Sequence, residues 1–172
     1  MMKWLCMVWL LIGSSLIASQ KEYIKLVDRI TANFTKELTK EKNMYLFGYG
    51  GRMMFDVEEI SMSYNVVKHA SIDEARRLFV EVAERYLARI NADEKLRPFL
   101  HNYPFTINNL DLGIGFENEK RQAHDDLAYV VYRKKTGKIV YNANDPKEDM
   151  FYKIYEEPYE EAVRLVNNLD NQ

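Results

Sequence analysis

The chain has 172 residues, and its 24 lysines and arginines nearly balance its 26 aspartates and glutamates, for a formal net charge of −2. This balance gives no sign of the basic surface that binds nucleic acid or anionic lipid, so neither partner is expected. Cys6 is the only cysteine, and it lies in an N-terminal apolar run. Disulfides, thiolate metal ligands and a thiol nucleophile are therefore excluded from the remainder of the chain.

Residues 1–19 have the three parts of a secretory signal peptide. Lys3 supplies a positive start, residues 4–12 form an uninterrupted apolar run, and small residues precede the polar Gln20. We expect cleavage between Ser19 and Gln20, and export to the periplasm or the extracellular space. The apolar stretch is shorter than the about 20 residues that span a bilayer, so no membrane span is expected after cleavage. The alternative is an uncleaved segment that anchors the chain in the membrane.

Residues 20–172 are long enough for a single domain with a substantial core. An amphipathic helix is predicted over residues 20–42, where apolar side chains recur every three or four positions. Residues 43–60 show no regular pattern, although Asp56 is expected to open a short helical turn. Apolar and polar side chains then alternate over residues 62–66, which predicts a strand.

The next helix is predicted to begin at Ser71. Ser71 and Glu74 match a capping box, in which each side chain bonds to the backbone amide of the other residue. Apolar residues from Ile72 to Ile90 mark one face of this helix, and polar residues at 91–93 end it.

In the second half of the chain the apolar pattern changes to a period of two. Strands are predicted at residues 110–116, 127–133, 138–142 and 150–155, with a hairpin loop at 134–137. Pro158 is expected to open a final helix. These elements predict an α+β domain: an antiparallel sheet of about four to five strands, mainly in the second half, with helices packed on one face.

Two glycines in the first of these strands indicate a candidate binding surface. Gly113 and Gly115 lie two apart, on the face opposite the apolar stripe. Glycine in a strand often marks the close approach of another group. The neighbouring strands supply Tyr129, Tyr132 and Tyr141, which predicts a shallow, tyrosine-walled groove on the open sheet face. The alternative is that aromatic rings from those strands lie over the glycines.

A second candidate site is the loop His124-Asp125-Asp126, which gathers titratable side chains. A metal site here would need a third ligand from elsewhere in the chain. A solvated loop before a strand explains the same residues without a site. The residues considered as the missing ligand are His69, His101 and Asp111.

The remaining motifs do not predict catalysis. The glycine-rich residues 48–52 lack the Gly-Lys-Ser or Gly-Lys-Thr ending of a phosphate loop, and a turn is the simpler interpretation. In a helix Glu58 and Glu59 would point about 100° apart, so they would not converge on one bond. No G-x-S-x-G motif is present. We therefore predict no catalytic residue, no metal and no cofactor.

About one third of the chain resembles a group of small exported bacterial proteins of uncharacterised function. The resemblance implies export and a single domain, and it transfers no activity, ligand or functional residue. It is carried by five short segments: Tyr49-Gly50-Gly51, Glu58-Glu59-Ile60, Ile72-Asp73-Glu74-Ala75-Arg76, Leu96-Arg97-Pro98-Phe99-Leu100 and Tyr103-Pro104-Phe105.

Together these features predict an exported, non-enzymatic domain that binds a protein or a component of the cell envelope. One alternative is a small hydrolase or metal-dependent enzyme that uses the His124-Asp125-Asp126 loop. A second alternative is a purely structural protein of the envelope.

Overall fold

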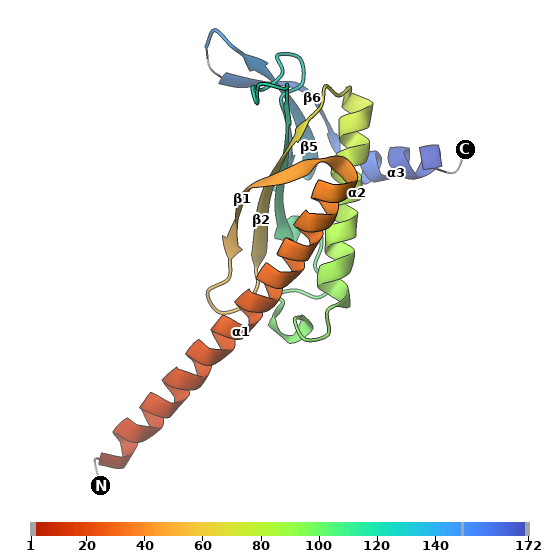
Figure 1. The fold of residues 1–172 in the computed structure, drawn as a ribbon. Helices are drawn as coiled ribbons and strands as arrows, with labels where there is room; N and C mark the ends of the chain where they lie inside the picture. Colours follow the sequence, from red (N-terminus) through yellow and green to blue (C-terminus); the bar gives the residue numbers. More distant parts are fainter. Residues whose placement is uncertain (1–2, 149, 171–172) are drawn as a thin grey trace.

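A computed structural model describes the backbone of residues 3–148 and 150–170, and the side chains of residues 22–148 and 150–168. Within these ranges the chain forms three α-helices and one six-stranded sheet (Figure 1), which confirms the α+β class. The helices are α1 (Lys3–Lys42), α2 (Ile72–Ala92) and α3 (Tyr159–Asp170). The strands are β1 (Met44–Arg52), β2 (Glu59–Val67), β3 (Leu110–Glu117), β4 (Tyr129–Arg133), β5 (Lys138–Asp145) and β6 (Met150–Pro158).

The sheet is mixed and uses strands from most of the chain, so the prediction of an antiparallel sheet confined mainly to the second half is wrong. The six strands lie side by side in chain order from β1 to β6, so the sheet has more strands than the four to five that were predicted. The pair β2–β3 is parallel, while the other neighbours are antiparallel. Parallel neighbours need a long crossover, which α2 provides.

The core lies between one face of the sheet and the helices α1 and α2. Burial alternates strictly along β2, and β3 presents its apolar stripe to the same side, as predicted. On the helices, Phe34 of α1 and Tyr86 of α2 are fully buried and their rings contact each other, with centroids 5.3 Å apart. The Tyr64 hydroxyl hydrogen-bonds Thr35 at 2.9 Å, which places α1 directly over β2.

The predicted capping box at the start of α2 is present. The Glu74 amide donates to Ser71 Oγ at 3.3 Å, and the Ser71 amide donates to Glu74 Oε2 at 2.9 Å. The hydrogen bond from Lys68, followed by those from the Ser71 amide and hydroxyl, lowers the pKa of Glu74 to about 2. The helix therefore begins with an ionised carboxylate at its positive end.

Two details of the irregular region differ from expectation. Residues 44–52 form β1, although their mixture of glycines and aromatics has no period of two. Asp56 opens no helical turn: it lies in a bend before Val57, which forms an isolated bridge with Leu100. Both segments take their conformation from neighbouring chain rather than from their own pattern.

The predicted signal segment, residues 1–19, lies outside the residues whose side chains are described, as does the Ser19–Gln20 junction. Cleavage there stays a prediction. Among the residues that the structure describes, no helix has the length and apolar character needed to cross a membrane.

Candidate functional site

The two glycines of β3 lie on the open face of the sheet, opposite the helices. Gly113 pairs with Val131, and Gly115 pairs with Tyr129. A Cβ atom at Gly113 would lie 1.7 Å from the Tyr129 hydroxyl oxygen, and one at Gly115 would lie 2.5 Å from Asn65 Oδ1. Gly113 therefore makes room for an aromatic ring, as the alternative interpretation predicted, whereas Gly115 makes room for the amide of Asn65, which was not predicted.

The other two tyrosines of the predicted groove point to the opposite face. Tyr132 donates a hydrogen bond to Asn108 Oδ1 at 2.7 Å, and Tyr141 is fully buried in the core. The reason is the strand period: Tyr129 and Tyr132 are three residues apart, and an odd separation places two side chains on opposite faces. Tyr141 pairs with Val130 and so shares the core face. The expected grouping of three tyrosines is not formed.

An apolar pocket of about 360 Å³ does lie on the open face, beside Gly115. Its aromatic walls come from three strands: Phe47 of β1, Tyr129 of β4 and Phe151 of β6. The last two rings stack with centroids 6.3 Å apart, and burial raises the pKa of Tyr129. Phe47 and Phe151 are 74% and 56% exposed, so the mouth of the pocket is apolar and open to solvent.

The polar groups of this pocket already bond to one another. Asn65 Nδ2 donates to Glu117 Oε1 at 2.6 Å, and the Tyr45 hydroxyl donates to Glu117 Oε2 at 2.5 Å. Both oxygens of the carboxylate thus have partners inside the protein. This arrangement suits the binding of an apolar group better than proton transfer.

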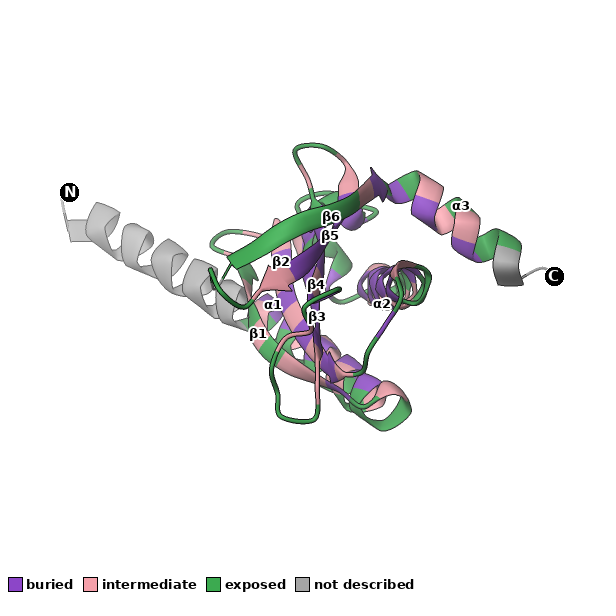
Figure 2. Cartoon of the chain, turned by 90° about the horizontal axis from the view of Figure 1, so that it is seen from above, coloured by how far each residue is buried: buried purple, intermediate pink, exposed green. Residues whose placement is uncertain are grey.

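The edge strand β6 continues the apolar surface. Its large apolar residues are 40–59% exposed, and within the described residues only β5 pairs with it. Figure 2 shows β6 exposed along most of its length at the border of the sheet. The register places Phe151 on the open face and Met150, Tyr152 and Tyr155 on the other face, and a bulge at Ile154 interrupts the alternation. The residues are Met150, Phe151, Tyr152, Ile154 and Tyr155.

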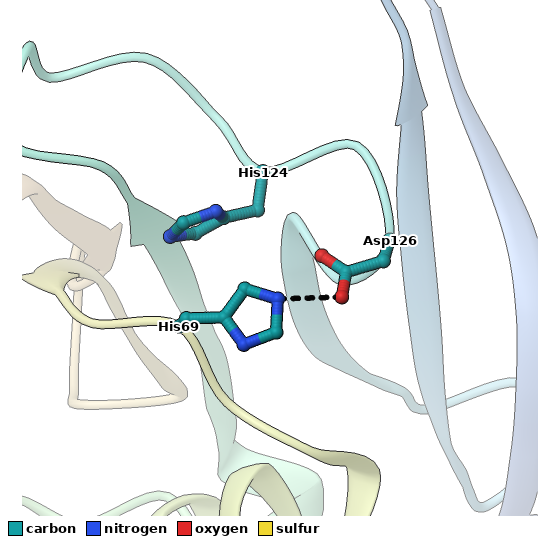
Figure 3. Close-up of side chains that lie close together, drawn as sticks. All are labelled: His69, His124 and Asp126. Carbon is teal, nitrogen blue, oxygen red and sulfur yellow. Dashed lines mark hydrogen bonds and ion pairs between the residues drawn. The ribbon is translucent and has the colours of Figure 1, made fainter.

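Two histidines and an aspartate meet at the end of the parallel strands (Figure 3). His69 follows β2, whereas His124 and Asp126 lie in the loop after β3. Parallel strands bring their carboxyl ends to the same edge of a sheet, and the amide of Lys68 donates to the Glu117 carbonyl at 3.0 Å there. The predicted loop thus finds its third titratable partner in His69.

The three side chains of this cluster are close. His69 Nε2 lies 2.6 Å from Asp126 Oδ2, and the rings of His69 and His124 are 4.9 Å apart at 88°. Partial burial opposes the change, but hydrogen bonds from the Leu127 amide and from His69 hold the pKa of Asp126 below its usual range. Asp125 is exposed and does not belong to the cluster.

A second cluster of titratable side chains contains Asp56, Glu58 and His101. His101 Nδ1 lies 2.8 Å from Asp56 Oδ2, and this hydrogen bond raises the pKa of His101. Arg52 Nε lies 3.7 Å from Glu58 Oε2, so a guanidinium already compensates the negative charge. Of the three ligands considered in the sequence, only His69 joins the His124 loop; His101 belongs to this second cluster and Asp111 to neither.

Comparison with known proteins found no matching protein-family profile, no matching curated protein and no matching solved structure.

Proposed function

We propose that this chain is an exported, non-enzymatic domain that binds an extended apolar segment of a partner protein at β6. Export, to the periplasm or the extracellular space, is supported by the composition of residues 1–19. Binding is supported by one observation above the others: a nine-residue edge strand whose large apolar side chains are 40–59% exposed. An exposed apolar surface of this kind usually marks a site of contact with another molecule.

The sequence of β6 lacks most of the features that normally keep an edge strand from pairing. Such strands are usually short, or carry prolines and lysines along the edge. In β6 the proline, Pro158, comes only at the end, and the one lysine, Lys153, is held by Glu156 at 2.8 Å. The pairing of β6 with β5 is irregular at Ile154, so the regular stretch that is left open to another extended segment is the first part of the strand, residues 150–153.

The mode of binding follows from the geometry of an edge. A partner segment would add a seventh strand beside β6, with backbone hydrogen bonds for affinity and side chains pointing alternately to both faces for specificity. On the open face, Phe151 stacks on Tyr129 and borders the pocket of about 360 Å³. This pocket has room for one large apolar side chain of the partner, which would provide selectivity.

A library of random peptides displayed on phage tests the proposal with the full chain as bait. We expect selected peptides to carry alternating apolar residues. Phe151→Ser should weaken their binding at least about tenfold, because it removes the wall of the pocket. Tyr152→Ser is the matched control: Tyr152 is 51% exposed on the same strand, but points to the other face, away from the pocket.

Two results would contradict the proposal. One is the selection of peptides whose affinity is the same for wild type and Phe151→Ser. The other is sedimentation of the free chain as a dimer that Phe151→Ser dissociates, which would mean that a second copy of this chain covers the edge.

A further inference from the structure

We propose that His69, His124 and Asp126 bind a divalent transition-metal ion such as Zn²⁺, at a site separate from the peptide-binding edge. One donor atom from each residue lies within 4.8 Å of the other two. In a tetrahedral zinc site with bonds of 2.0–2.1 Å, ligand atoms lie about 3.4 Å apart. The observed spacing therefore needs only small rotations of the side chains to enclose an ion.

Backbone hydrogen bonds hold the loop that carries His124 and Asp126 in place before an ion binds. The His124 amide donates to the Phe116 carbonyl at 3.3 Å, just after an isolated bridge between Glu117 and Ala123. The Asn144 amide of β5 donates to the Asp125 carbonyl at 3.2 Å, which ties the far side of the loop to the sheet. Fixed backbones of this kind reduce the cost of ordering the ligands when the ion binds.

Each side chain can turn to the ion at little cost. Asp126 Oδ1 accepts the Leu127 amide at 2.9 Å, a contact that orients the carboxylate and leaves Oδ2 directed at His69. The imidazole of His124 has no hydrogen bond within the described residues, and its Nε2 is buried without a partner. Either nitrogen of this ring can therefore be presented without breaking a hydrogen bond.

The donor set selects the class of ion. Two imidazole nitrogens and one carboxylate oxygen suit borderline divalent ions such as Zn²⁺ and Co²⁺, whereas Ca²⁺ and Mg²⁺ prefer sites made of oxygen. The side chains of His69 and Asp126 are 64% and 60% exposed, which leaves the remaining coordination positions open to water. The second cluster fits less well, because two of its three ligands are carboxylates and Arg52 supplies a cation there.

The test is titration of the full chain, purified without a histidine tag, with Zn²⁺ by calorimetry and with Co²⁺ by visible absorption. We expect one ion per chain. His69→Ala and His124→Ala should each weaken Zn²⁺ binding by at least about tenfold and remove the cobalt absorption. Asp125→Asn, next to the cluster, and His101→Ala, in the second cluster, are matched controls that should leave affinity within about twofold of wild type.

The proposal is overturned if wild type binds no ion at a ratio of one, or if His69→Ala binds as tightly as wild type. It is also overturned if His101→Ala abolishes binding, since the ion would then sit at the other cluster. Melting curves verify that the variants are folded; if His124→Ala is not, the exposed His69 decides the question. Phe151→Ser should bind Zn²⁺ normally, so a failure of the peptide proposal and a failure of this one can be told apart.

Discussion

The contact between Gly113 and Tyr129 can be tested by adding a single methyl group. In Gly113→Ala, the new Cβ would lie 1.7 Å from the Tyr129 hydroxyl oxygen and 2.4 Å from Cζ. Since ordinary contact is about 3.5 Å, the ring must withdraw by roughly 2 Å. That movement would disturb its stacking on Phe151. Overpacking of this degree costs about 1–3 kcal/mol, or a fall in Tm of roughly 3–9 °C for a domain of this size.

The assay is a double-mutant cycle with Tyr129→Ala, in which urea denaturation measures the free energy of unfolding of each variant. Once the ring is removed, Gly113→Ala should be neutral or stabilise the strand by about 0.5–1 kcal/mol, so the two changes should be strongly non-additive. Gly50→Ala in β1 is the control, because a Cβ there meets nothing within 4 Å. Additive free energies, or a Gly113→Ala variant as stable as wild type, would refute the placement of the ring.

Four further outcomes are expected. Ser71→Ala should cost about 0.5–2 kcal/mol in chemical denaturation, because a helix-end amide loses its acceptor; an unchanged midpoint would mean that the cap is not needed. The pKa of Glu74 is lowered from 4.5 to about 2, chiefly by a lysine and the cap, so its contribution to stability is present above pH 4.5 and is lost as the pH falls to 2. Thermal melts of Glu74→Gln should show a weaker pH dependence in that window, and an identical profile would contradict this. Arg76→Met should destabilise the fold by about 3–5 kcal/mol, because the buried Glu157 carboxylate, which is 3% exposed, loses the cation that donates to it at 2.7 Å. Urea denaturation measures this loss, and a value below about 1 kcal/mol would contradict the role of the ion pair. N-terminal sequencing of exported protein should begin at Gln20, whereas an intact initiator methionine would indicate an uncleaved anchor.

The elements that the sequence predicted well are those whose signal is local. The capping box of α2 depends on four consecutive residues, and the hairpin around Gly137 depends on one residue with φ of 67°. The apolar alternation of β3 likewise needs no knowledge of its neighbours. In contrast, β1 could not be recognised, because its mixture of glycine and aromatic residues becomes a strand only by pairing with β2.

The site was predicted less well because it depends on pairing between distant strands. The parallel pair β2–β3 brings His69 to the His124 loop, and the sequence offers no direct sign of that pairing. One signal was available: a helix between two strands is the usual crossover of a parallel pair. The error at Tyr132 was avoidable, since counting residues from Tyr129 places it on the other face.

The loop between β3 and β4 has a thermodynamic consequence, because it borders both proposed sites. Ala123 and Ala128 line the apolar pocket, while His124 and Asp126 belong to the histidine cluster. If an ion and a peptide both bind, they act on the same short stretch of backbone. Linkage then requires that any factor by which Zn²⁺ changes the affinity for the peptide equals the factor by which the peptide changes the affinity for Zn²⁺.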